Sequence, residues 1–382
     1  MDSDFKSSAS GSHGSPAGLD GIVAGETRLS TVGVEGVGLT YLGYAIEDLA
    51  SHGNFEEVAY LLLYGELPSA ASLADFRNRL QSRRSLPHAV KEVLRQIPAT
   101  AHPMDVLRTG ISMLGTLEPE RNGGAGTEVA ERLLGCAPTM LLLWYRHHQE
   151  ENVGDFELGD SIAEQFLWGL HGRKPEPLAT RAMDLSLILY AEHEWNASTF
   201  TARVIASTLS DFYSAITGAV GALRGPLHGG ANEAAMELIS QMHDADHAEV
   251  RLKEMLTKRE KVMGFGHRVY RKNDPRSDLI KPWAMRLCRE TGRMPMFEIS
   301  ERIEQVMMRE KKIFPNVDFY AASLYHCLGI PTEMFTPIFV LSRISGWSAH
   351  IIEQRADNRL IRPLAKYTGP APRQWVAIGD RR

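Results

Sequence analysis

The sequence predicts an all-α protein, and three observations point to that fold class. Apolar residues recur at three- and four-residue spacing over most of the chain after residue 54, as on the buried face of a helix. Strands and helices do not alternate in the manner of a parallel α/β sheet. Only residues 27–42 alternate β-branched or apolar residues with Gly and Ser, so we expect one small hairpin there and little other strand.

The first part of the chain contains a tail and a clearly marked helix. Residues 1–19 are rich in Ser and Gly and show almost no apolar periodicity, which is typical of a disordered tail. Asn54 and Glu57 have the spacing of a capping box, and Gly65 is a typical helix end, so a helix is predicted over 55–64. The next predicted helices are 71–82, 88–96, 103–115, 127–148, 159–170 and 177–192.

Residues 197–222 predict a buried central helix. Their apolar residues follow the helical spacing, and the positions between them are largely Ala, Ser, Thr and Gly, which allow other helices to approach closely. The remaining predicted helices are 231–243, 246–260, 276–291, 298–312, 317–328 and 334–355.

Composition and charge narrow the class of protein. A chain of 382 residues, 43% hydrophobic and 23% charged, fits a globular protein with two domains. The formal charge of -5 gives no reason to expect a nucleic-acid partner, and no apolar run approaches the roughly 18–20 residues of a membrane span. Cys136, Cys288 and Cys327 are far apart in sequence and form neither a disulfide framework nor a CxxC metal pattern. We therefore expect a soluble cytoplasmic protein without a metal site.

The stretch 262–276, VMGFGHRVYRKNDPR, is the strongest candidate for function. The glycines of 264–266 allow backbone to approach a ligand closely, and His267 follows in the same loop. The Asp-Pro pair at 274–275 is typical of a helix start, which places Arg276 in the first turn, where it suits a carboxylate ligand. The same pattern also fits a glycine-containing turn before a helix with a solvated basic edge.

Two further segments contain candidate acid–base groups. His228, in GPLHGGAN, precedes a predicted helix start, where the macrodipole favours a neutral imidazole that can donate to a developing oxyanion. Asp318, in FPNVDFY, follows the candidate N-cap Asn316. Its aromatic surroundings would raise its pKa whereas a helix start would lower it, and an ordinary helix-start aspartate is the simpler interpretation of this segment alone.

Arg343 interrupts an otherwise apolar helix, so its guanidinium must be paired with an internal carboxylate or a bound anion. His193 precedes the helix predicted at 197 and fits a capping or packing role as well as a ligand role. His243 and His247 have metal-compatible spacing, but the run is so polar that a solvated helix edge is the better interpretation.

Taken together and in this order, LRGPLHGGANEA, VMGFGHRVYRKNDPR and FPNVDFY resemble the three active-site segments of the citrate synthase family. The resemblance runs from about Gly21 to the C-terminus. It implies an all-α homodimer in which a large domain, 20–229 with 329–382, carries a smaller inserted domain, 230–328. The expected reaction condenses an acyl-CoA with oxaloacetate and then hydrolyses the thioester, with CoA as part of the substrate and no cofactor.

The resemblance also implies a role for each candidate residue. Asp318 would take the α-proton, His228 would hydrogen-bond the thioester oxygen, and His267 would polarise the oxaloacetate carbonyl. The expected oxaloacetate ligands are His193, Arg276, Arg343 and Arg362, the last reaching in from the partner subunit. The expected CoA contacts are Gly264, Phe265, Gly266, Arg271, Lys311 and Lys312, although Lys311 and Lys312 also fit a solvated charged edge.

Within the family, the segments 102–110, 191–204, 329–339 and 349–370 resemble bacterial 2-methylcitrate synthases. They predict propionyl-CoA as the preferred thioester with citrate synthesis as a side activity. A citrate synthase that prefers acetyl-CoA is the alternative, because the sequence GHRVY is common in citrate synthases. Leu42 stands where many relatives have arginine. A helical protein that binds CoA without catalysis is disfavoured by the presence of His228, His267 and Asp318 together.

Overall fold

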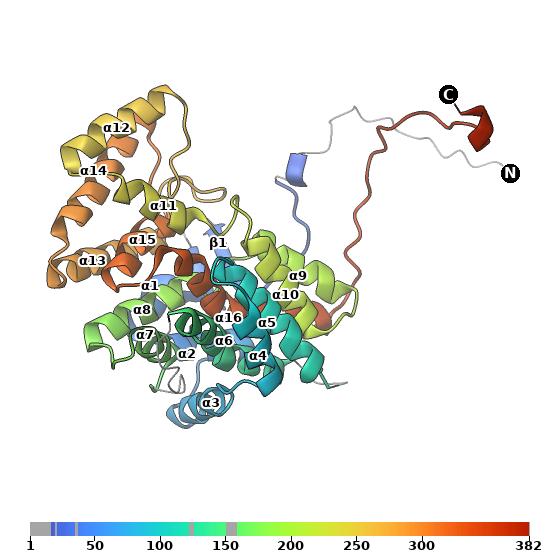
Figure 1. The fold of residues 1–382 in the computed structure, drawn as a ribbon, viewed down its shortest axis with the longest axis horizontal. Coiled ribbons are helices and arrows are strands. Elements are labelled where there is room, and N and C mark those ends of the chain that lie inside the picture. Colours follow the sequence, from blue (N-terminus) through green and yellow to red (C-terminus); the bar gives the residue numbers. More distant parts are fainter. Residues whose placement is uncertain (1–16, 20, 35–36, 122–125, 150–158, 382) are drawn as a thin grey trace.

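The computed structural model describes residues 17–19, 21–34, 37–121, 126–149 and 159–381, and over these ranges the all-α prediction is confirmed (Figure 1). The N-terminal helices are α1 (Ile46–His52), α2 (Phe55–Tyr64), α3 (Ala70–Ser82), α4 (His88–Gln96), α5 (Pro103–Leu117), α6 (Thr127–His148), α7 (Ile162–His171) and α8 (Pro177–Tyr190). The later helices are α9 (Ala197–Ser207), α10 (Phe212–Leu223), α11 (Ala231–Ser240), α12 (Ala245–Thr257), α13 (Pro275–Glu290), α14 (Met294–Lys311), α15 (Val317–Cys327) and α16 (Phe335–Ala356). Short 3-10 helices are η1 (Ala17–Leu19), η2 (Thr332–Met334) and η3 (Ile378–Asp380).

The predicted hairpin is present and has one additional strand. Strands β1 (Ser30–Val34) and β2 (Gly38–Tyr41) pair antiparallel, with Ser30 opposite Tyr41, and the short β3 (Tyr44–Ala45) pairs with β2. The predicted tail lies outside the described residues except for η1.

Local capping explains why most helix starts were predictable. The capping box of Asn54 and Glu57 is formed, and Gly65 ends α2 in the left-handed conformation with φ of 88°. Asp274 caps α13 before Pro275, and Asn316 caps α15. Helix α1 was not predicted, because it has seven residues and its N-cap, Ala45, makes no side-chain cap hydrogen bond.

The prediction of one central helix over 197–222 is wrong. The chain breaks between α9 and α10, where Leu209 has a left-handed φ of 64° and Asp211 starts α10 by accepting a hydrogen bond from the Ser214 backbone N–H. The central helix is instead α16, which is buried along most of its length and contacts α2, α6, α8, α9 and α10. Capping by Asp211 outweighs the helical spacing that continues across the break.

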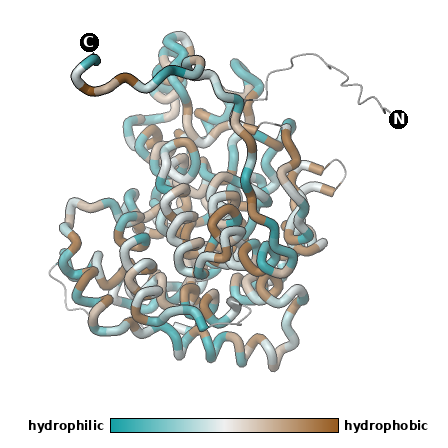
Figure 2. Tube along the Cα trace, turned by 90° about the vertical axis from the view of Figure 1, so that its right-hand side faces the viewer, coloured by the Kyte–Doolittle hydropathy of each residue, from teal (hydrophilic) through white to brown (hydrophobic). Residues whose placement is uncertain are grey.

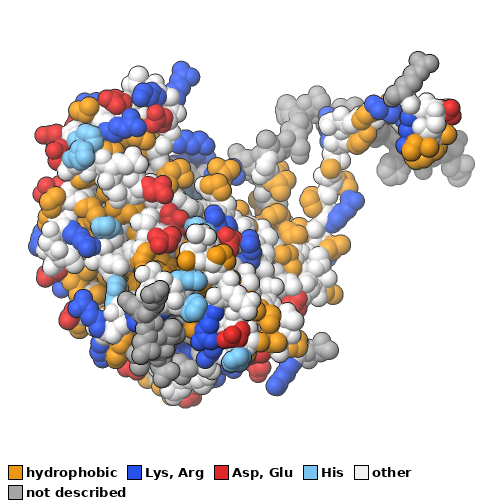
Figure 3. Space-filling model, viewed as in Figure 1, with side chains coloured by type: hydrophobic (Ala, Val, Ile, Leu, Met, Phe, Trp, Pro, Cys, Tyr) orange, Lys and Arg blue, Asp and Glu red, His pale blue; other side chains and the backbone are white. Residues whose placement is uncertain are grey.

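Helices α11–α15 lie together on one side of the molecule, and the other helices surround α16 (Figure 1). The division into domains at 230–328 stays a prediction. After α16 the chain leaves the body as an extended arm, residues 357–381, and residues 359–363 of this arm line a cavity together with the N-terminal segment. Figure 2 marks hydrophobic positions on the trace of this arm, and Figure 3 shows hydrophobic side chains along it. Leu364, Tyr367 and Trp375 of the arm are exposed. In the part of the chain that the structure describes, no helix is both long and apolar enough to span a membrane.

Candidate active site

Three connecting segments and three helices bring the candidate residues together. His193 lies between α8 and α9, His228 between α10 and α11, and His267 between α12 and α13. Arg276 and Asp318 occupy the first turns of α13 and α15, and Arg343 lies within α16. The rings of His193 and His267 are 5.0 Å apart, and Arg343 interacts electrostatically with His193, His228 and Asp318. These residues therefore form one site.

Asp318 is held in place by the start of α15 and by one tyrosine. Its backbone N–H donates to Asn316 Oδ1 at 3.1 Å, and its Oδ1 accepts from the Tyr190 hydroxyl at 2.5 Å. Burial raises the pKa of Asp318 to about 6, against the opposing effects of the Tyr190 hydrogen bond and the Arg276 charge. The question left open by the sequence is thus decided: desolvation exceeds the effects that favour the charged form.

His228 is held in one neutral tautomer. Its Nε2 accepts from the Ser198 backbone N–H at 3.2 Å, which requires an unprotonated Nε2 and leaves the proton of a neutral ring on Nδ1. Burial, followed by the Arg343 charge, lowers the pKa of His228 to about 4. The expectation of a neutral imidazole holds, but burial and a buried cation account for it without the helix macrodipole.

His267 has the opposite tautomer. Its Nδ1 accepts from the backbone N–H groups of Val269 at 3.1 Å and Tyr270 at 3.2 Å, so the proton of the neutral ring is on Nε2. Burial and the Arg276 charge lower the pKa of His267 to about 4. The neighbouring His193 Nε2 lies 3.1 Å from the Tyr270 hydroxyl, and burial also holds the pKa of His193 well below its ordinary value.

The two buried arginines differ in how they are paired. Arg276 binds Asp274 with two hydrogen bonds, Nε to Oδ1 at 3.0 Å and Nη2 to Oδ2 at 2.9 Å. Arg343 donates from Nε to the Tyr190 carbonyl at 2.6 Å and stacks over the Phe339 ring at 4.7 Å.

No carboxylate of the described residues forms an ion pair with Arg343, and its buried Nη1 has no hydrogen-bond partner. Burial accordingly lowers the pKa of the Arg343 guanidinium to about 10. Of the two partners considered for Arg343, an internal carboxylate or a bound anion, the geometry therefore favours the anion.

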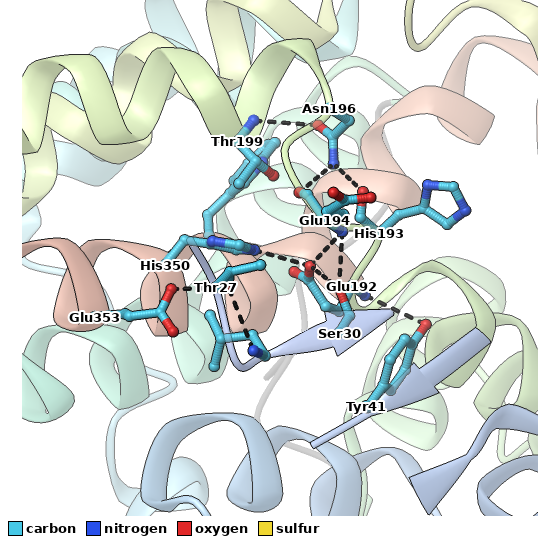
Figure 4. A network of polar contacts seen from close by, with 12 residues as sticks. Thr27, Ser30, Tyr41, Glu192, His193, Glu194, Asn196, Thr199, His350 and Glu353 are labelled. Atoms are coloured by element: carbon cyan, nitrogen blue, oxygen red, sulfur yellow. Dashed lines mark hydrogen bonds and ion pairs between the residues drawn. The ribbon is translucent and has the colours of Figure 1, made fainter. Parts of the chain in front are cut away.

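A buried polar network lies behind His193, and none of its members was singled out from the sequence (Figure 4). Glu192 Oε1 accepts from the Ser30 hydroxyl at 2.9 Å and lies 2.8 Å from His350 Nε2. His350 Nδ1 accepts from Arg203 Nε at 2.8 Å, which places the His350 proton on Nε2, facing Glu192. The network fixes the turn after α8, and the His193 ring points away from it.

The loop 264–266 is hydrogen-bonded to the residues that lead into α15. Gly264 and Gly266 have left-handed φ values of 84° and 75°. The Gly266 N–H donates to the Phe314 carbonyl at 2.8 Å, and the Asn316 N–H donates to the Gly264 carbonyl at 2.9 Å. The Phe265 and Phe319 rings are 4.6 Å apart. The loop that carries His267 and the helix that carries Asp318 are therefore one unit.

Four basic residues that the sequence predicted to bind substrate lie away from this site in the single chain. Arg271, Lys311 and Lys312 are exposed, and Lys312 ends α14 with a left-handed φ of 58°. Arg362 is exposed on the C-terminal arm, where it lines a cavity of about 1010 Å³ together with residues of the N-terminal segment, α9 and α16. No contact within the described part of the chain joins these four residues to Asp318 or His228.

The chain has relatives among known protein families. Residues 18–364 match the family model described as citrate synthase, C-terminal domain. The chain is 55% identical to the 2-methylcitrate synthase of Shewanella oneidensis, over 96% of this chain and 98% of that one. It is 45% identical to citrate synthase 2 of Bacillus subtilis, over 95% and 98% of the two chains.

Among solved structures, the chain resembles citrate synthase from the archaeon Thermoplasma acidophilum in a ternary complex with carboxymethyl coenzyme A and oxaloacetate. The TM-score is 0.89 and the identity 36%, over 95% of this chain and 98% of that one. Sequence and fold agree over nearly the full length of both chains, and this chain belongs to the citrate synthase family.

Proposed function

We propose that the protein condenses propionyl-CoA with oxaloacetate and hydrolyses the resulting thioester to 2-methylcitrate and CoA, with acetyl-CoA as a poorer substrate. The observation that carries this proposal is the acid–base arrangement. One site combines a carboxylate of raised pKa with two neutral histidines. In each histidine one ring nitrogen accepts from backbone N–H groups, so the other carries the proton and can donate to substrate. A base and oxyanion donors are the two requirements for making a carbon nucleophile next to a thioester.

In the first step, Asp318 takes the α-proton of the acyl group while His228 Nδ1–H donates to the thioester oxygen. Removal of the α-proton shifts negative charge from the carbon to the thioester oxygen, where the N–H of His228 stabilises it. A carboxylate with a pKa near 6 is a stronger base than an ordinary aspartate and is still ionised at neutral pH. The neutral His228 ring can donate its N–H to the developing enol oxygen, and it does not have to be protonated to do so.

In the second step, the enol carbon attacks the ketone carbon of oxaloacetate, and His267 Nε2–H donates to the ketone oxygen as it becomes an alkoxide. Arg276 and Arg343 bind the two carboxylates of oxaloacetate, with His193 beside them. Water then cleaves the thioester, so propionyl-CoA, oxaloacetate and water give 2-methylcitrate and CoA. The side chains of the site supply the base and the donors for each step, and we assign no cofactor beyond the CoA carried by the substrate.

We further propose that the protein works as a homodimer in which Arg362 completes the partner's oxaloacetate site. Arg362 lies on an arm that leaves the body of its own subunit and carries exposed apolar side chains such as Leu364 and Trp375. Apolar side chains in such a row are usually covered by a partner surface.

The choice of propionyl-CoA rests on similarity. The relative with 55% identity is named 2-methylcitrate synthase, whereas citrate synthase 2 of Bacillus subtilis is 45% identical. The two thioesters differ by one methylene, worth about 1–3 kcal/mol in a pocket, so some activity with acetyl-CoA is expected. A citrate synthase that prefers acetyl-CoA is the second candidate.

The test is the initial rate of CoA release with oxaloacetate, measured for propionyl-CoA and acetyl-CoA on one preparation. We expect kcat/KM to be roughly 10- to 200-fold higher with propionyl-CoA. A preference for acetyl-CoA would replace the proposed substrate by the second candidate. The absence of CoA release with either thioester would contradict the proposed reaction.

A further inference from the structure

The buried carboxylate of Asp274 joins the first turns of α13 and α15. Its Oδ1 accepts from the Arg276 backbone N–H at 3.1 Å and from Arg276 Nε at 3.0 Å. Its Oδ2 accepts from Arg276 Nη2 at 2.9 Å and from the Val317 backbone N–H at 3.1 Å. Asp274 is fully buried, and Val317 immediately precedes Asp318. One carboxylate therefore touches both the oxaloacetate-binding guanidinium and the backbone next to the base.

We infer that Asp274 is a positioning residue that holds Arg276 and Asp318 in a fixed mutual geometry, so that oxaloacetate and the base are aligned by the same group. The inference rests on the proposed function. A cap would need only one of the four hydrogen bonds. The other three fix the guanidinium plane and tie α15 to α13. Alignment of this kind matters because a misplacement of about 1 Å can cost about 100-fold in rate.

Asp274 also contributes charge to the site. The groups that act on Asp318 are Tyr190 on α8, Arg276 and Asp274 at the start of α13, and Arg343 on α16. Among these, the Asp274 carboxylate raises the pKa of Asp318, and it also raises that of His267. Removing its negative charge should therefore move the acid limb of kcat/KM to lower pH.

Asp274→Asn is the first test. The amide oxygen can still cap α13, but the NH₂ group would face the N–H donors of Arg276 Nη2 and Val317, so two acceptor contacts become donor–donor contacts. We expect the KM for oxaloacetate to rise roughly tenfold and kcat to fall roughly 10- to 100-fold, with the acid limb shifted down. The matched control is Asp278→Asn, in the same helical turn but exposed and in contact with Asn273; it should behave as wild type.

Val317→Pro separates the two contacts of Asp274 and also covers the case in which Asp274→Asn does not fold. Proline is tolerated at the first helical position, and the extended Asn316 (φ −90°, ψ 179°) suits a residue before proline. The change replaces the N–H that binds Asp274 Oδ2 by a ring carbon, which pushes that oxygen away while Oδ1 can keep Arg276 Nε, so kcat should fall by a larger factor than the KM for oxaloacetate rises.

The outcomes distinguish this inference from the proposed function. If wild-type protein releases no CoA, the proposed function fails. If wild type is active and both folded variants have wild-type kcat, KM and acid limb, the positioning role of Asp274 alone is overturned. A folded Asp274→Asn variant with lower kcat but an unshifted limb and unchanged KM would also overturn it, because a general loss of order explains that result.

A separate observation concerns two cysteines. Cys288 and Cys327 are 39 residues apart, yet their Sγ atoms lie 2.9 Å from each other between the ends of α13 and α15. Both are buried, and Cys327 is 6% exposed. Contact with Cys288, together with Thr291 and the Arg293 guanidinium, lowers the pKa of Cys327, which favours the thiolate, the reactive form of the side chain.

We propose that Cys288 and Cys327 form an oxidation site that a peroxide converts to an intramolecular disulfide. The Cys327 thiolate attacks one peroxide oxygen, giving a sulfenic acid and water, and the Cys288 sulfur then displaces the hydroxyl as a second water. Two thiols and one hydrogen peroxide thus give one disulfide and two waters. The bond would join the helix ends far from Arg276 and Asp318, so activity should be retained while the thermal midpoint rises by several degrees.

The test treats folded protein with hydrogen peroxide, blocks free thiols with N-ethylmaleimide after denaturation and measures the intact mass. We expect two of the three thiols to become unreactive and to return with dithiothreitol, and Cys288→Ser or Cys327→Ser to abolish this loss. Three reactive thiols after peroxide, stable sulfinic acid at Cys327 in the wild type, or a disulfide that involves Cys136 would each overturn the proposal.

Discussion

At the scale of single residues, the base and the two histidine donors have pKa values that keep all three groups in their working forms at neutral pH. Burial raises the pKa of Asp318 to about 6 and lowers those of His228 and His267 to about 4. In the proposed mechanism the base is ionised and the histidines are neutral, so all three lose function as pH falls, but Asp318 loses it first. We expect kcat/KM to fall about tenfold per pH unit below pH 6. A pH–rate profile measures this, and full activity down to pH 4.5 would contradict the assignment of Asp318 as a base of raised pKa.

Arg343 gives a second prediction at this scale, because its Nη1 has no hydrogen-bond partner in the described structure. A charge-assisted hydrogen bond contributes about 1.5–3 kcal/mol, so Arg343→Gln should raise the KM for oxaloacetate roughly 10- to 100-fold and leave the KM for propionyl-CoA nearly unchanged. Arg355→Gln is the control: it lies on the same helix but is paired with Glu120 at 2.5 Å, so it should affect stability without changing either KM. Equal effects of the two substitutions on the KM for oxaloacetate would contradict the role of Arg343.

Sequence reasoning located His228, His267, Asp318 and Arg276 because each stands in a local motif with its own turn or cap. It missed Glu192 and Tyr190, which act through partners far away in sequence: Tyr190 is 128 residues from Asp318. Local spacing contains no information on such contacts. Asp274 was recognised as a cap, but its bond to Val317 could not be predicted for the same reason.

At the scale of elements, the loop 264–266 and the start of α15 should behave as one unit. A Cβ on Gly264 would lie 3.0 Å from Phe319 Cβ, in addition to the strain of a left-handed φ of 84°. Gly292 has a similar φ of 70° and open space around it. Gly264→Ala should therefore lower kcat/KM at least tenfold, whereas Gly292→Ala should cost only about 1–2 kcal/mol of stability and leave kinetics unchanged. Kinetics and thermal unfolding of both variants provide the comparison; indistinguishable kinetics would separate the loop from the site.

Most helices were predictable because amphipathic spacing and end signals agree, as in α2 and α13. The prediction failed between α9 and α10, where helical spacing continues through a break marked only by Asp211 and a strained Leu209. Conversely, α16 is buried along most of its length although many of its residues, such as Ser342, Arg343 and His350, are polar, so its sequence did not distinguish it as the central helix. Burial on all sides depends on the surrounding helices, which one segment does not reveal.

At the scale of the whole molecule, the proposed dimer predicts complementation between two inactive variants. If Arg362 acts on the partner's site, a mixed dimer of Arg362→Ala and Asp318→Asn subunits has one complete site. Co-expression should then restore roughly one quarter of wild-type activity, since about half of the dimers are mixed and half of their sites are complete. No recovery in dimers shown to be mixed would place Arg362 in the site of its own subunit or outside any site. Only the family resemblance indicated a role for the arm, because the proposed role of Arg362 depends on a second chain.

The most direct test of the central claim is to identify the product by mass spectrometry after wild-type protein and the Asp318→Asn variant are each given propionyl-CoA and oxaloacetate. Wild type should form 2-methylcitrate and free CoA. Asp318→Asn should form at least about 100-fold less while oxaloacetate still raises its thermal midpoint, because the variant loses the base and keeps the arginines. Undiminished product from Asp318→Asn would contradict the assignment of the base, and CoA released by wild type without 2-methylcitrate would contradict the condensation itself.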